Sequence, residues 1–181
     1  MAKRRKILVI ILILLLGVGV VCLWLMRRNK MMSADITSSN GARYAMLLPN
    51  DFTPAHLNDS AASLQYESIR RGMYVLVIDE SKAKIISFGL DYDLETYMKI
   101  ATRAKDVEGV HINRPVTING NKGFQTDIIE MAKGKKMFYR LTCIETPKFF
   151  YQVLIASPES TMEANKADMD KMVSSFKEVE K

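Results

Sequence analysis

The longest uninterrupted apolar segment of the chain is residues 7–26, ILVIILILLLGVGVVCLWLM, which carries no charged side chain. The basic sequence KRRK precedes it and RRNK follows it. A helix of that length is about 30 Å long, which matches the hydrocarbon thickness of a bilayer. The pattern predicts a single transmembrane signal-anchor helix at 7–26, preceded by an N-terminal tail at 1–6.

The basic flanks of this segment predict its orientation. Four basic residues and the amino terminus lie before it and three basic residues lie after it, so the positive-inside rule favours a cytoplasmic N-terminus and an extracytoplasmic C-terminal domain. The apolar region of a cleaved signal peptide is usually 7–15 residues long, so the longer run here favours an uncleaved anchor. Signal-peptide cleavage near Ala34 is the alternative. Cys22 follows Val20 and Val21, a poor setting for lipid attachment.

Beyond the anchor, residues 27–42 are mostly small and polar and are interpreted as a linker. Residues 43–48 form a short apolar run that predicts a first strand, and 52–62 predict a loop. The runs 64–69 and 73–78 predict a hairpin. The second run is apolar on both faces, which favours a central, doubly covered strand. Residues 85–89 are expected to be a short extended piece.

Two segments have helical periodicity. Residues 93–105 place Leu94, Tyr97, Met98, Ala101 and Ala104 on one stripe, with Asp91 or Asp93 available as the N-cap. The second predicted helix is 161–178, and its apolar stripe is Met162, Met169, Met172, Val173 and Phe176. Ser160 and Glu163 have the spacing of a capping box at its start.

Between the helices the pattern predicts four antiparallel strands, at 110–118, 122–131, 137–145 and 149–156. Asn119-Gly120 separates the first two and is a strong hairpin signal, since both turn positions need positive φ. Pro115 favours an edge strand or a bulge. The chain therefore predicts an α+β domain at 43–181, with two main helices flanking an antiparallel sheet of six or seven strands.

Charge excludes one class of partner. The formal net charge is +6, but seven of the 26 basic residues flank the apolar segment, and the other 19 face all 20 acidic residues. Residues 31–181 thus carry a formal charge of −1 (19 − 20). A nearly neutral domain lacks the basic surface that nucleic-acid binding requires, so we expect no nucleic-acid partner.

The residue types that carry chemistry do not form a known motif. Asp91, Asp93 and Glu95 alternate like the start of a calcium loop, but Thr96 and Thr102 stand where that loop needs Gly and Glu. His56, His111 and Cys143 lack metal-ligand spacing, and Cys143 is expected to be a buried, inert thiol. We expect no cofactor, no metal and no catalytic activity.

A basic cluster lies in the turn between two predicted strands. Lys133, Lys135 and Lys136 suit contact with anionic lipid head groups near the anchor, at about 1 kcal/mol per charge. The alternative is a solvated turn.

The arrangement resembles the PsbP-like fold family, which includes photosystem II PsbP, the Ran-binding Mog protein and DcrB-type bacterial envelope proteins. The resemblance rests on residues 74–79 (YVLVID), on Leu94, Glu95 and Tyr97, on residues 118–120, and on a last helix ending in Ser175-Phe176-Lys177. It implies an antiparallel sheet between helices and a role in binding or assembly, with no active site common to the family.

These observations lead to one function hypothesis and two alternatives. The first is a membrane-anchored, non-enzymatic binding or assembly module at the outer face of the cytoplasmic membrane, which contacts a partner of an envelope complex or transport system. One alternative is an extracytoplasmic domain that binds a small ligand or lipid, or an unrecognised hydrolase. The other is a purely structural part of the envelope.

Overall fold

The computed structural model describes residues 30–57, 59–103, 112–132 and 134–179. The predicted anchor at 7–26, His111 and Lys133 lie outside these residues. Within the described ranges, no helix has both the length and the apolar character needed to cross a membrane.

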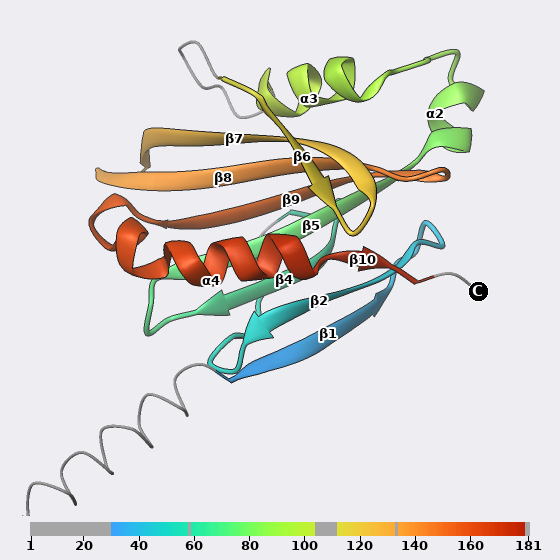
Figure 1. The fold of residues 1–181 in the computed structure, drawn as a ribbon. Coiled ribbons are helices and arrows are strands. Elements are labelled where there is room, and N and C mark those ends of the chain that lie inside the picture. The colour runs from blue at the N-terminus through green and yellow to red at the C-terminus, as the bar shows by residue number, and fades with distance from the viewer. Residues whose placement is uncertain (1–29, 58, 104–111, 133, 180–181) are drawn as a thin grey trace, which may run out of the picture.

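A seven-stranded antiparallel sheet forms the centre of the fold (Figure 1). Its order is β3-β4-β5-β9-β8-β7-β6. The strands are β3 (Thr53–Pro54), β4 (Ala62–Ser68), β5 (Met73–Ser81), β6 (Arg114–Ile118), β7 (Asn121–Ala132), β8 (Lys135–Glu145) and β9 (Phe149–Pro158). The predicted four-strand meander is confirmed as β6 to β9. Pro115 lies on the edge strand β6, as its missing N–H requires.

The turn between β6 and β7 has the predicted hairpin geometry. Asn119 and Gly120 have φ values of 46° and 84°, the left-handed pair that a type I′ turn needs. The Asn119 amide also donates to the carbonyl oxygens of Ser174 and Phe176, at 3.1 and 2.7 Å. The hairpin is thereby joined to the end of the last helix, α4 (Met162–Ser175).

Helix α3 (Leu94–Arg103) confirms its predicted stripe and cap. Four of the five predicted stripe residues lie in the described chain and are buried, namely Leu94, Tyr97, Met98 and Ala101. Asp93 Oδ1 accepts a hydrogen bond of 2.7 Å from the Thr96 backbone N–H.

The predicted capping box of α4 is wrong. Residues Glu159–Thr161 form a 3₁₀ turn, so Thr161 is the N-cap and its side chain makes no capping bond.

The segment expected to be extended at 85–89 is instead helical over most of its length. Helix α2 spans Lys82–Ser87, with Ser81 Oγ accepting a hydrogen bond from the Lys84 N–H. Gly89 follows at φ 75°, a left-handed conformation that suits glycine. The prediction failed because the helix is one short turn held by its cap, and none of its residues is buried.

The predicted linker is also corrected. Residues Met31–Thr37 form strand β1, which pairs antiparallel with β2 (Arg43–Pro49) over its whole length. β2 pairs on its other side with β10 (Lys177–Glu178), giving a second, three-stranded sheet. Met32, Ala34 and Ile36 face the core at every second position, an alternation too weak in hydrophobicity to be recognised. Only residues 27–30 separate the predicted anchor from this strand.

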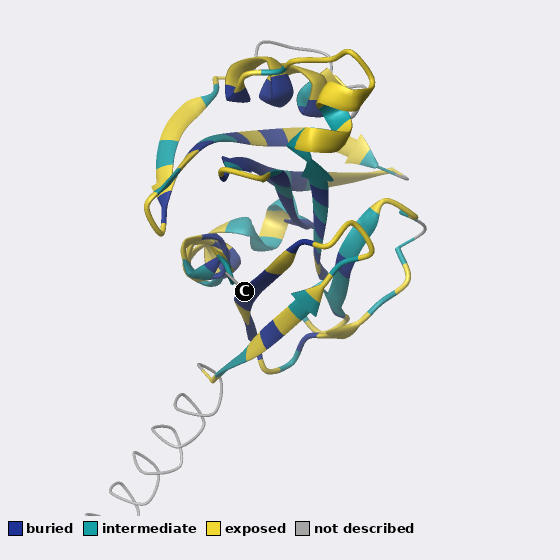
Figure 2. Cartoon of the chain, turned by 90° about the vertical axis from the view of Figure 1, so that its right-hand side faces the viewer, coloured by how far each residue is buried: buried dark blue, intermediate teal, exposed yellow. Residues whose placement is uncertain are grey.

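The core lies on both faces of the large sheet (Figures 1 and 2). One face packs against α4 and the three-stranded sheet, and the other packs against α3. The strand in the middle of the sheet is β9, with buried side chains on both faces. The expectation that residues 73–78 are central and doubly covered is therefore wrong. Only one face of β5 is fully buried, because α3 packs over β7 and β8 instead.

Candidate binding site

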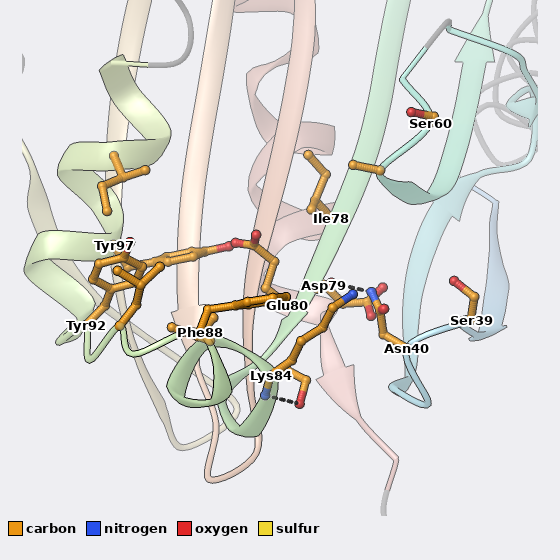
Figure 3. Close-up of a pocket in the computed structure, with 15 residues that line it drawn as sticks. Ser39, Asn40, Ser60, Ile78, Asp79, Glu80, Lys84, Phe88, Tyr92 and Tyr97 are labelled. Carbon is orange, nitrogen blue, oxygen red and sulfur yellow. Dashed lines mark hydrogen bonds between the residues drawn. The ribbon is translucent and has the colours of Figure 1, made fainter.

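A cleft of about 490 Å³ opens between β5 and the segment that runs from α2 to α3 (Figure 3). Four parts of the chain contribute side chains to it. They are the β1–β2 turn (Ser39, Asn40), the segment before β4 (Ser60, Ala61), the end of β5 with α2 (Ile78–Ser81, Lys84, Ile85), and the α2–α3 loop with α3 (Phe88, Leu90, Tyr92, Tyr97, Ile100). We call this site the distal cleft.

One wall of the distal cleft is apolar and open to solvent. Phe88 is 70% exposed, Leu90 44% and Ile100 41%. The short α2 and the turn at Gly89 hold Phe88 and Leu90 away from the core. The loop between α2 and α3 has no regular apolar face that could pack them against the sheet. Single exposed apolar residues are common, whereas several gathered at one concave site are typical of a binding surface.

The opposite part of the cleft is polar. Asp79 is 1% exposed, and its Oδ2 accepts a hydrogen bond of 2.7 Å from Ser38 Oγ. Asn40 Nδ2 donates to the Asp79 backbone carbonyl at 2.9 Å, which fixes the β1–β2 turn against β5. Lys84 extends from α2 toward these residues (Figure 3). Asp79 Oδ1 has no hydrogen-bond partner among the described residues, and a buried oxygen in that state is costly.

Tyr97, a buried residue of α3, lines the cleft. Its ring stacks on Phe150 at 4.5 Å, and Gln152 Nε2 donates to its hydroxyl at 3.0 Å. Burial and the neighbouring Glu80 carboxylate raise the pKa of Tyr97. The phenol therefore stays protonated at neutral pH and serves as a fixed hydrogen-bonding group.

The described lining of the distal cleft contains no histidine or cysteine. His56 is exposed in the loop between β3 and β4 and is not among the lining residues. Cys143 is 0% exposed, and burial raises its pKa to about 12, which confirms the expected buried thiol. No cluster of three or more potential metal ligands occurs in the described part of the chain. The cleft can bind by shape, apolar contact and hydrogen bonding.

The lysines singled out from the sequence lie elsewhere. Lys135 and Lys136 are exposed at the start of β8, and Lys136 Nζ is 3.8 Å from Glu159 Oε2. They lie at the end of the sheet opposite the distal cleft (Figure 1).

Comparison with known proteins gives structural neighbours only. No protein-family profile matches the sequence, and no curated protein matches it in sequence. Among solved structures, the chain is similar to LpqN of Mycobacterium tuberculosis, described as involved in cell envelope biogenesis. The TM-score is 0.56 and the identity 11%, over 85% of this chain and 94% of that one.

Two further structures extend the similarity. The cyanobacterial PsbP (CyanoP) of Synechocystis sp. PCC 6803 matches with a TM-score of 0.52 and 11% identity, over 81% of this chain and 92% of that one. The protein Mog1, solved as a point mutant, gives 0.52 and 14%, over 81% and 96%. The described domain has a PsbP-like fold. The resemblance predicted from the sequence is confirmed at the level of the fold.

Sequence reasoning assigned none of the residues of the distal cleft in this PsbP-like domain to a binding site. Its polar residues come from separate and individually ordinary features, among them Asn40 in a turn, Asp79 and Glu80 near the end of a strand, and Lys84 in a short helix. The available signal was Phe88-Gly89-Leu90, where apolar residues flank a glycine outside any regular period.

Proposed function

We propose that this protein is a membrane-anchored binding module. Its apolar segment at 7–26 holds the PsbP-like domain at the outer face of the cytoplasmic membrane, and the distal cleft receives a segment of a partner protein from an envelope complex or transport system. The observation that carries this proposal is the distal cleft itself, which exposed Phe88 and Leu90 line together with Asn40 and Lys84.

The chemistry of the cleft indicates what such a segment presents. An apolar side chain would pack on Phe88, Leu90 and Ile100, removing surface that is now in contact with water. Hydrogen-bonding groups beside it would reach Asn40 and Lys84. Apolar burial supplies most of the affinity in such a site, and the polar groups fix the register.

Two further observations support this proposal. The described lining contains no histidine or cysteine, so it lacks the Ser–His and Cys–His pairs that common hydrolases use, which favours binding over hydrolysis. The neighbour LpqN is described as involved in cell envelope biogenesis, a setting that agrees with a domain outside the cytoplasmic membrane.

The experiment is photo-crosslinking in intact cells, with the full-length chain carrying a photoreactive amino acid at position 88 or at position 171. Lys171 is exposed on α4, outside the cleft. We expect a discrete crosslinked protein from position 88 and none from position 171. Identical products from both positions, or none from position 88, would contradict the proposal.

A matched pair of variants tests the chemistry of the cleft. Phe88 and Ile86 are 70% and 61% exposed, but only Phe88 lines the cleft. Phe88→Ala, measured by crosslinking from position 100, should lose about tenfold or more in yield, since a buried aromatic anchor contributes at least 1–2 kcal/mol. Ile86→Ala should leave the yield unchanged.

A small-ligand site is the second candidate, and the size of the cleft favours it. A volume of about 490 Å³ lies within the usual range of ligand pockets, roughly 300–1,000 Å³. Native mass spectrometry of the purified full-length protein would then show a bound small molecule that Phe88→Ala releases and Ile86→Ala retains.

A further inference from the structure

Several segments distant in sequence meet at one end of the domain. The Asn50 N–H donates to the Lys30 carbonyl at 3.0 Å, beside Asp51, whose carboxylate accepts from Arg70 at 2.8 Å. Gly72 lies beside Pro158, since a Cβ added to it would be 3.2 Å from Pro158 Cγ, and Pro158 pairs with Met137 at the start of β8. We call this surface the proximal end. It comprises Lys30, Asn50, residues 69–72, Met131, Ala132, residues 134–136, Pro158 and Glu159.

The proximal end exposes both apolar and basic side chains. Ile69 is 84% exposed at the β4–β5 turn, and Met131 is 64% exposed beside the β7–β8 turn. The exposed basic residues are Lys30, Arg70, Lys135 and Lys136. Against these four stand Asp51, which binds Arg70 at 2.8 Å, Glu159, which lies 3.8 Å from Lys136, and Glu163 in the first turn of α4. The difference is an excess of one positive charge (4 − 3).

The chain leaves this end toward the predicted anchor. Because β1 begins at Met31, only residues 27–30 separate it from Met26. Four residues reach at most about 14 Å when fully extended. A linker of the predicted sixteen residues would have let the domain turn freely, whereas four hold its proximal end close to the bilayer surface.

We propose that the proximal end rests on the anionic lipid surface of the membrane. Ile69 and Met131 enter the head-group region, and Arg70, Lys135 and Lys136 lie against lipid phosphates. Apolar side chains interleaved with basic ones are the composition that binds such an interface. This inference rests on the proposed anchor and deepens it by giving the domain an orientation.

The orientation places the distal cleft away from the bilayer. Strand β5 begins at Met73, next to the proximal turn, and ends at Ser81 in the cleft. Its eight residue steps span about 26 Å at 3.3 Å per residue. The cleft then opens toward partners that stand above the membrane surface.

The test uses the full-length chain in vesicles, with a fluorophore on Ile69→Cys or on Ile86→Cys in a Cys22→Ala background. Cys143 is 0% exposed and stays unlabelled. Ile86 lies on α2 at the opposite end of the domain (Figure 1). The vesicles are phosphatidylcholine alone or mixed with phosphatidylglycerol, and both contain a lipid whose head group quenches fluorescence. We expect strong quenching at position 69 in the anionic vesicles and little at position 86.

A pair of charge reversals tests the contacts. Lys135→Glu with Lys136→Glu should lower the docked-to-undocked ratio by more than about fivefold for each lysine, because losing one positive charge at an anionic surface costs about 1 kcal/mol and each reversal also adds a negative charge. The matched control reverses Lys122 and Lys148, two exposed lysines at the distal end, and should leave the quenching at position 69 unchanged.

The outcomes separate the two proposals. In a chain that resists carbonate extraction, two results would overturn the docked orientation and leave the anchor intact. They are equal quenching at positions 69 and 86, and quenching at position 69 that does not respond to anionic lipid. A chain that carbonate strips from the vesicles would overturn the anchor and this inference with it.

Discussion

At the scale of single residues, Asp51 connects the segments of the proximal end. Its Oδ2 accepts hydrogen bonds from Ser68 Oγ at 2.8 Å and Arg71 Nε at 3.0 Å, in addition to Arg70. Partial burial alone would raise the pKa of Asp51, but the bonds from Arg71, Ser68 and Arg70 outweigh it and lower the pKa to about 2. The folded state therefore binds a proton at Asp51 less readily than the unfolded chain does.

This difference predicts a specific acid sensitivity. The unfolded carboxyl titrates near pH 3.8, so the stabilisation from Asp51 is complete above about pH 4 and is lost as the pH falls through about 2. Urea unfolding of the full-length protein between pH 7 and pH 2 measures it. Asp51→Asn should be less stable at pH 7 and should lose less stability on acidification. The control Asp91→Asn, in the exposed loop before α3, should keep the wild-type pH dependence.

At the scale of elements, two buried arginines attach α4 to the rest of the domain. Arg71 binds Asp168, and Arg140 binds Asp170. The Arg140 side chain is 4% exposed and also donates to both carboxylate oxygens of Asp127, at 2.8 and 3.0 Å. α4 therefore depends on charge pairing as well as on its apolar stripe.

Removing Arg140 should strongly destabilise the fold. Arg140→Ala removes a side chain that is 4% exposed and its hydrogen bonds to Asp127 and Asp170, and a hydrogen bond to a charged group contributes about 1.5–3 kcal/mol. Arg114 binds the same Asp127 at 2.8 Å but is 54% exposed, so Arg114→Ala should cost less than about 1 kcal/mol. Chemical denaturation of both variants gives the comparison. Equal losses would show that burial of Arg140 is not what matters.

The elements also show which parts of this fold could be predicted from sequence patterns. Helix α3 and the β6–β7 hairpin were predictable because a complete stripe and an Asn-Gly turn are local signals. Strand β1 and helix α2 were not, because β1 is fixed by pairing with β2 and α2 by one cap and one glycine. The distal cleft depends on those two elements, since the β1–β2 turn supplies Asn40 and α2 supplies Lys84. The candidate site could therefore not be predicted from the sequence, because two of the elements that supply its side chains could not be predicted.

At the scale of the whole molecule, the proposed anchor and docked orientation would make the four residues 27–30 set the height of the distal cleft above the bilayer. A partner segment held at a fixed height meets the cleft often, because tethering both molecules to one membrane raises their effective concentration. Under this proposal the connector length is part of the binding function, although the described lining of the cleft comes from other parts of the chain.

Lengthening the connector tests this coupling. Twenty flexible Gly/Ser residues inserted between Asn29 and Lys30 add about 25 Å of root-mean-square span, so the proximal end is no longer held against the lipid and the cleft samples many heights. We expect the thermal unfolding of the domain to stay the same, since β1 and its pairing with β2 are untouched. Crosslinking from position 88 should fall several-fold, because effective concentration drops with tether length. The same twenty residues added after Lys181 should leave the crosslinking unchanged. An undiminished yield with the internal insertion would mean that the partner reaches the cleft from solution, independently of the membrane.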